Sequence, residues 1–218
     1  MGSITRSFAN NITTSGVLLP ASLTNNSIAN VTSYNASVAT GGMKLISSQT
    51  ASNSASISFT TGIDSTYKEY QFWFIDIHPR TNSMEFEFNM STDSGSNYNV
   101  TKTSTAFLAF HDEANVDAVL DYQTGKDLAQ STSFQSISAG GVGGEADESL
   151  SGYMSLFNPA STTYVKHFIS TSNFLMSADY THNAYVAGYG NTTSAINAVQ
   201  FKMSSGNFDG TILMYGIV

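Results

Sequence analysis

The chain has 218 residues and a formal net charge of −8, from 16 acidic and 8 basic residues, and it contains no cysteine. Its basic residues are scattered singly, which excludes the clustered basic surface that nucleic-acid binding needs, and without cysteine it has neither disulfides nor thiolate metal sites. No apolar run reaches the roughly 20 residues that span a bilayer. We therefore expect a single-core protein with no nucleic-acid partner and no membrane partner.

Residues 1–42 are rich in Asn, Ser and Thr and hold only short apolar groups, such as residues 17–19 (VLL). The apolar positions recur at neither the helix period nor the strand period. We predict an extended N-terminal arm over residues 1–42 that attaches to another protein. Residues 43–218 are predicted to form the folded domain.

Strand patterns begin at residues 43–48 and 55–60, with a turn-prone AlaSerAsnSer at 51–54 between them. Residues 70–78 are apolar on both alternating faces, which predicts a central strand that Pro79 ends. Residues 83–91 alternate cleanly, with Met84, Phe86, Phe88 and Met90 on one face, as in a half-buried strand.

The same patterns predict further strands. Two other segments are not predicted to be strands. The interval 112–130 has room for one short helix, and the glycine-rich residues 139–145 are expected to be a flexible loop. About ten strands separated by turns predict an all-β fold, two antiparallel sheets in a jelly-roll-like sandwich. The remaining strands are expected at 105–111, 134–138, 149–157, 164–171, 184–189, 198–204 and 211–217.

Acidic residues after the strand at 105–111 are the candidate metal ligands: Asp112, Glu113, Asp117 and Asp121. Calcium takes six to eight oxygen ligands, which the loops of a β-sandwich often supply. The run lacks the alternating acidic spacing of a dedicated calcium loop, so a solvated loop is the competing interpretation. His111, directly before this run, is a weaker candidate for a base or a ligand.

Aromatic and carboxylate side chains offer two further candidate sites. Tyr98, Tyr122 and Tyr180 lie outside the clear strand patterns and are the candidates for stacking on a sugar. Glu85 and Glu87 lie on the polar face of one strand, the pattern of a glycosidase pair, although two solvated glutamates opposite a Met and Phe core face are the favoured interpretation. His167 is mid-strand and is interpreted as a core or interface histidine.

The sequence carries no serine-hydrolase elbow, phosphate-binding loop or dinucleotide fingerprint. We expect a protein that is not an enzyme and that carries no cofactor.

Seven segments have a recognisable sequence: residues 3–14 (SITRSFANNITT), 59–70 (FTTGIDSTYKEY), 77–79 (IHP), 91–99 (STDSGSNYN), 156–159 (LFNP), 164–168 (YVKHF) and 205–207 (SGN). These segments resemble virion structural proteins of tailed bacteriophages that infect aquatic bacteria. The resemblance covers essentially the whole chain.

The resemblance implies a protein on the particle surface: a capsid decoration, or a short head or tail fibre knob. It implies other virion proteins of the capsid or tail as partners, a homotrimer as the assembly, and the virion as location after assembly in the host bacterial cytoplasm. The alternative is a carbohydrate-binding tail-fibre adhesin that recognises host surface glycans. A depolymerase using Glu85, Glu87 or the acidic loop is the third hypothesis.

Overall fold

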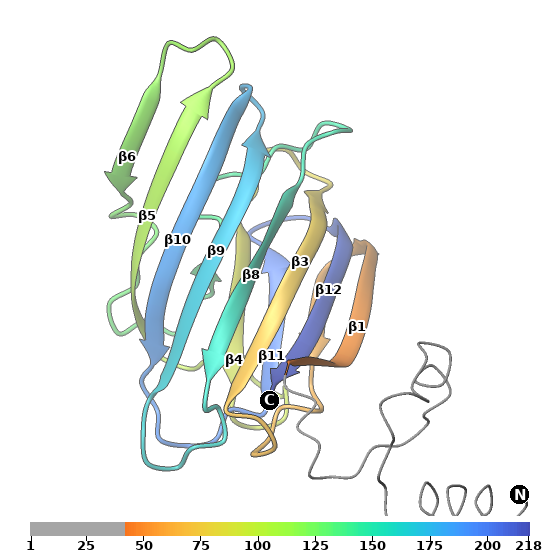
Figure 1. The fold of residues 1–218 in the computed structure, drawn as a ribbon, viewed down its shortest axis with the longest axis vertical. Coiled ribbons are helices and arrows are strands. Elements are labelled where there is room, and N and C mark those ends of the chain that lie inside the picture. The colour runs from red at the N-terminus through yellow and green to blue at the C-terminus, as the bar shows by residue number, and fades with distance from the viewer. Residues whose placement is uncertain (1–41) are drawn as a thin grey trace, which may run out of the picture. The chain divides into compact units, whose positions relative to one another are not determined.

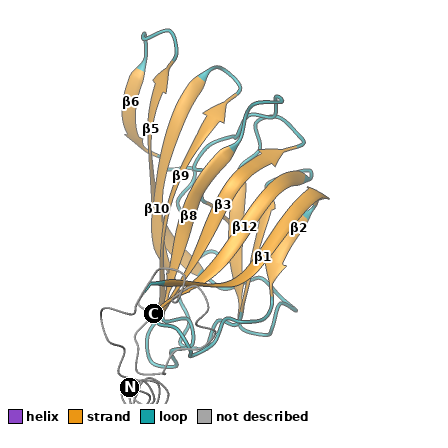
Figure 2. Cartoon of the chain, turned by 45° about the vertical axis from the view of Figure 1, so that its right-hand side comes forward, coloured by secondary structure: helices purple, strands orange, loops and turns teal. Residues whose placement is uncertain are grey.

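The computed structural model describes residues 42–218, which form twelve β-strands in two antiparallel sheets (Figure 1). Figure 2 shows only strands and loops in this part of the chain. Residues 42–218 therefore contain no helix that is long and apolar enough to cross a membrane. Residues 1–41 of the predicted arm lie outside the described residues.

The larger sheet has eight strands and faces the viewer in Figure 1, with β4 and β11 of the four-stranded sheet behind it. Its order is β1 (Met43–Ser54), β12 (Phe208–Ile217), β3 (Glu69–Pro79), β8 (Leu150–Phe157), β9 (Lys166–Met176), β10 (Tyr180–Gly190), β5 (Lys102–Asp112) and β6 (Ala118–Tyr122). The smaller sheet has the order β2 (Ser56–Phe59), β11 (Ala198–Met203), β4 (Phe86–Ser91) and β7 (Gln135–Ser136).

The strand order confirms the predicted sandwich and shows its jelly-roll topology. If β5, β6, β9 and β10 are set aside, eight strands remain, in the order first, eighth, third, sixth in one sheet and second, seventh, fourth, fifth in the other. This interleaving is that of a jelly roll, which is built from two Greek keys. The two other hairpins add strands to one edge of the larger sheet. We call β1, β12, β3 and β8 the sandwich half, and β9, β10, β5 and β6 the extension.

Phenylalanine rings fill the space between the sandwich half and the smaller sheet. Phe201 of β11 lies at the centre, with its ring centroid 5.3 Å from both Phe72 and Phe74 of β3. It is also 5.8 Å from Phe86 and 6.3 Å from Phe88 of β4, and all five rings are fully buried. The predicted alternation of residues 83–91 is thereby confirmed for Phe86 and Phe88, and Met90 is buried with them.

A non-repetitive segment between β6 and β8 covers the inner face of the extension. Ser172 of β9 donates from its Oγ to the Ile137 carbonyl, and the Gly143 amide donates to the Leu175 carbonyl, each at 3.0 Å. Val142 in the same segment is fully buried, and its amide donates to the Met84 carbonyl at 2.9 Å. The segment joins the extension to the residues that precede β4 of the smaller sheet.

The glycine-rich residues 139–145 are packed, which corrects the prediction of a flexible loop. A Cβ on Gly141 would lie 2.5 Å from the Ser83 Oγ, and one on Gly144 would lie 2.8 Å from the Asn82 Cα. Glycine is present here because two backbone segments approach closely. A glycine-rich sequence occurs both in such close contacts and in flexible loops, so the sequence alone did not distinguish them.

Two other local predictions are wrong. The expected turn at 51–54 belongs to β1, where Asn53 has a φ of 51° and the pairing with β12 shifts between Ala51 and Ser54. The turn-forming residues therefore make a bulge inside a strand. The expected helix within 112–130 is also absent, because residues 118–122 form β6 against β5 and turns follow.

Candidate functional site

The face of the eight-stranded sheet that points away from the smaller sheet carries a row of aromatic side chains. Cross-strand pairing places Trp73 opposite Tyr153, Tyr185 opposite Phe107, and Phe107 opposite Tyr122. Thr171 of β9 pairs with both Tyr153 and Tyr185, so the row runs unbroken from β3 to β6. We call these residues the aromatic row: Trp73, Tyr153, Tyr185, Phe107 and Tyr122.

The aromatic row is exposed, although its rings are held in place. Each ring is between 36% and 45% exposed. Phe107 and Tyr185 stack at 5.0 Å with an interplanar angle of 15°, and Trp73 and Tyr153 lie 6.1 Å apart at 32°. The Trp73 Nε1 donates to the Gln71 Oε1 at 2.7 Å. The rings therefore present a preformed apolar ridge with a few fixed polar atoms.

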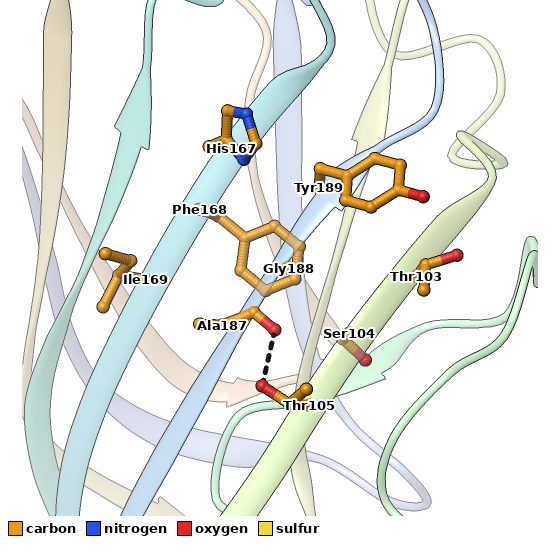
Figure 3. A pocket seen from close by; sticks show the side chains of 9 residues that line it. All are labelled: Thr103, Ser104, Thr105, His167, Phe168, Ile169, Ala187, Gly188 and Tyr189. Atoms are coloured by element: carbon orange, nitrogen blue, oxygen red, sulfur yellow. Dashed lines mark hydrogen bonds between the residues drawn. The ribbon is translucent and has the colours of Figure 1, made fainter.

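A hollow of about 430 Å³ lies beside the aromatic row over β5, β9 and β10 (Figure 3). It exists because Ala187 is small and stands between the larger Tyr185 and Tyr189 on the same face of β10. The Thr105 hydroxyl donates to the Ala187 carbonyl at 3.4 Å. The side chains around the hollow are those of Thr103, Thr105, His167, Ile169, Ala187 and Tyr189.

Charged side chains are missing from the centre of this outer face of the described sheet. Leu45, Tyr215, Gln71, Ser155, Ile169, Ala187 and Thr105 form the next cross-strand row, which runs parallel to the aromatic row. Neither row contains Asp, Glu, Lys, Arg or His. Carboxylates border the two rows: Glu69 accepts from the Ser155 Oγ at 2.7 Å, and Asp127 accepts from the Tyr122 hydroxyl at 2.8 Å. The centre of the surface can make apolar contacts and hydrogen bonds.

The inner face of the extension buries two lysines, which flank Gly190 in the strand register. The Lys102 Nζ donates to the Asn89 Oδ1 at 2.6 Å and to the Val100 carbonyl at 2.8 Å. Burial lowers the pKa of Lys102 to about 7, and burial also lowers the pKa of Lys166. Each ammonium has neutral oxygen acceptors, so desolvation is not offset by a carboxylate.

His182 is a buried histidine that the sequence did not single out. Its ring lies 5.0 Å from Phe174 and 5.4 Å from Phe110, and its Nδ1 has no hydrogen-bond partner within residues 42–218. Burial lowers the pKa of His182. His167, by contrast, is exposed on the outer face beside Tyr189. The core interpretation of His167 is therefore wrong, whereas the interface interpretation stays a prediction.

The four predicted calcium ligands are not brought together. The Asp112 carboxylate accepts from the backbone amides of Val116 and Asp117 at 2.9 and 2.8 Å, which closes the turn between β5 and β6. The hydrogen bond from the Asp117 backbone amide is the main cause of the lowered pKa of Asp112. Asp121 lies on β6 opposite Leu108, and Glu113 is exposed in the turn. Within residues 42–218, no three acidic or histidine side chains form a metal-binding group.

The three predicted sugar-stacking tyrosines lie in three different places. Tyr122 belongs to the aromatic row and donates from its hydroxyl to the Asp127 Oδ2 at 2.8 Å. Tyr180 packs against Phe110 at 5.6 Å at the start of β10. Tyr98 lies in the connection between β4 and β5, where its hydroxyl is buried without a partner among the described residues. They do not form one platform.

Glu85 and Glu87 both line a small polar hollow on the four-stranded sheet, and each is ion-paired. Glu85 pairs with Lys126, and the Glu87 Oε2 lies 3.3 Å from the Lys202 Nζ. Burial raises the pKa of Glu87, and the charge of Lys202 opposes that rise. The pairing gives each carboxylate a structural partner.

The aromatic row was not predicted from the sequence, apart from Tyr122 as a candidate for stacking on a sugar. Trp73, Tyr153, Phe107 and Tyr185 alternate with buried residues on their strands and point outward. The available signal was that both faces of residues 70–78 are apolar, a pattern that also fits a strand buried on both faces.

No family model, curated protein or solved structure matches this chain.

Proposed function

We propose that this protein is a non-enzymatic structural protein exposed on the surface of a bacteriophage particle, as a capsid decoration or a short head or tail fibre knob. The observation that carries the proposal is the outer face of the jelly roll, where a broad, uncharged and partly aromatic surface lies over the sheet. Such a surface suits contact with another macromolecule, because contiguous exposed apolar patches mark interaction sites. Jelly rolls are a common architecture of viral capsid domains and lectins.

Attachment through residues 1–42 fits the way the domain begins. The Val218 amide donates to the Gly42 carbonyl at 3.1 Å, so the described part of the chain starts beside its last residue, at the β1 edge of the larger sheet. Residues before Gly42 are therefore joined to the domain at this edge strand. The proposal assigns them the role of anchor on the capsid or tail.

The experiment is mass spectrometry of gradient-purified particles, combined with labelling by an antibody raised against residues 43–218. We expect the intact chain in the particle fraction, with label on the particle exterior and a copy number that separates capsid decoration from a tail location. Antibody against a cytoplasmic host protein serves as the control for carry-over. Particles that are free of the chain overturn the proposal.

A glycan-binding adhesin is the second candidate, favoured by the hollow beside the aromatic row (Figure 3). Tyr189 offers a ring, and Thr103 and Thr105 offer hydroxyls around a depression. Binding sites of small ligands combine apolar walls with a few placed polar groups in this way. Glycan-array binding that is lost in Tyr189→Ala and kept in Tyr164→Ala would favour this candidate, and absence of binding by the wild-type protein would remove it.

A further inference from the structure

The outer face concentrates most of the large apolar side chains that residues 42–218 expose. Five of them form the aromatic row, and Ile75, Ile169 and Leu120 stand near it at 39%, 49% and 69% exposure. Aromatic residues present about 150–250 Å² each, so five rings at roughly two-fifths exposure leave about 400 Å² of ring surface uncovered. Isolated exposed apolar residues are ordinary, whereas a contiguous patch of this size marks a contact surface.

The size of the patch matches what association between two proteins requires. A specific interface buries about 800 Å² on each partner, of which somewhat over half is apolar. The aromatic row alone supplies nearly that apolar part, and Leu45, Ile169 and Ile75 extend it. Aromatic residues at the centre of such a patch are the residues on which binding energy concentrates.

The absence of charged side chains from the two rows is compatible with a second copy of the chain as the partner. Two copies of a chain with net charge −8 repel each other, and they approach with least repulsion through a surface that carries no charge. The aromatic row and the row beside it are such a surface, since they contain only apolar, hydroxyl and amide side chains. A cationic partner would favour the acidic parts of the chain instead.

The shape of the face also fits a second copy. A ridge, the aromatic row, and the hollow over Ala187 lie side by side on one surface. In a self-complementary contact the ridge of one copy meets the hollow of the other, because both copies use the same patch. Phe107 and Tyr185 stack face to face at 5.0 Å, so each ring covers one face of the other.

We infer that the outer face of the eight-stranded sheet, centred on the aromatic row, is the surface through which this chain binds a second copy of itself. This inference does not rest on the proposed function, because self-association is measured on the purified protein and location is measured on particles. Either result can fail while the other stands.

The experiment compares the full chain with Tyr185→Glu by light scattering after size exclusion and by sedimentation velocity, over a series of protein concentrations. Because a contact in which both copies use the same patch pairs two chains, we expect the wild-type mass to be twice 23.3 kDa. A carboxylate in the row would be buried without a partner in the assembly, so we expect Tyr185→Glu to weaken association by about thirtyfold or more, the effect of losing one anchor residue. Ala187→Phe, which fills the hollow, should weaken association as well.

The matched control is Tyr164→Glu, because Tyr164 is 69% exposed and precedes β9, away from the row. It should associate like the wild type, and circular dichroism and the melting temperature of the variants at a concentration where all are monomeric verify that they fold. A wild-type chain that stays monomeric at the highest concentration, or an assembly that Tyr185→Glu leaves intact, overturns the inference. Binding of a neutral dextran or chitin oligomer to a monomeric wild type, lost in Tyr185→Glu, would assign the face to a glycan and also overturn it.

Discussion

The two halves of the eight-stranded sheet are covered in different ways, and their buried side chains differ accordingly. The sandwich half packs against a second sheet through phenylalanine rings, among them Phe72 and Phe74. The extension packs against the irregular segment between β6 and β8 and also touches β4 of the smaller sheet, where Phe168 lies 4.9 Å from Phe88. Its inner face buries polar residues beside apolar ones. Its buried polar residues are Lys102, Ser104, Asp112, Lys166, Ser170, Ser172 and His182.

The two inner faces differ because the backbone groups of the two covering layers have different needs for hydrogen-bond partners. A sheet satisfies its own backbone groups through its ladder, so a facing sheet needs to supply only apolar contact. An irregular segment leaves backbone donors and acceptors free, and these must find partners when they are buried. Ser104 accepts from the Leu128 amide at 2.9 Å, and the Gln135 Nε2 donates to the Lys126 carbonyl at 2.8 Å. Ser104 and Ser172 of the extension are thus partners of its loop cover.

The largest effect is expected from Phe201→Ala, on the strand β11 of the smaller sheet that packs against the sandwich half. Phe201 is fully buried and touches rings from both sheets, so removing it leaves a cavity that neither sheet can close. We expect a loss of about 3–5 kcal/mol in the free energy of unfolding. Urea denaturation followed by tryptophan fluorescence measures it.

The control for Phe201→Ala is Phe107→Ala, which removes the same side chain from the exposed face of the extension. It should cost at most about 1 kcal/mol at a concentration where the protein is monomeric. Equal losses in the two variants would mean that the extension relies on its outer face as much as the sandwich relies on its core, and the contrast between the two halves would fail.

The next largest effect is a pH dependence that originates in the extension. Burial lowers the pKa of Lys102 to about 7 in the folded protein, whereas an unfolded lysine titrates near 10.4. Between these two values the unfolded chain binds more protons, so the stability rises with pH in that window. From pH 7 to pH 9 the gain is about 2 kcal/mol. Urea midpoints measured at both values test it.

Lys102→Met should flatten this rise, and Lys44→Met, at an exposed position of β1, should leave it unchanged. A residual slope is expected in Lys102→Met, since burial lowers the pKa of Lys166 too. His182 adds a slope of the same sign at lower pH: its pKa is also lowered, so stability declines as the pH falls through 6.5. If the free energy of unfolding of the wild type does not change from pH 7 to pH 9, the lowered pKa of the buried Lys102 is contradicted.

The sandwich half and the smaller sheet that packs on it were readable from the sequence because their strands obey the simplest patterns. Residues 83–91 alternate, and Phe86 and Phe88 point inward as predicted. Pro79 ends β3 where it was expected to, as the last residue of the strand. A strand that packs against another sheet needs above all an apolar inner face, and this need appears in the sequence as alternating apolar residues.

The extension and the candidate site were less readable, because their residues are set by contacts between distant segments. All five residues of β6 are exposed, so no burial pattern marks the strand, and it exists through its pairing with β5. Gly141 and Gly144 leave room for the close contact with Ser83 and Asn82, where a Cβ would clash. The aromatic row depends on the register of six strands, from β3 to β6, which no local pattern encodes.

The smallest effect, and the closest test of the contrast, is expected from Ser172→Ala. The Ser172 Oγ is the hydrogen-bond donor to the buried Ile137 carbonyl of the loop cover, and alanine would leave that carbonyl without this donor. We expect a loss of about 1 kcal/mol in the free energy of unfolding. Thr171→Ala, the neighbouring residue on the opposite face of β9, should stay within about 0.5 kcal/mol. If Ser172→Ala costs no more than Thr171→Ala, the polar inner face of the extension does not stabilise its cover, and apolar replacements there should be tolerated as well as they are in the sandwich half.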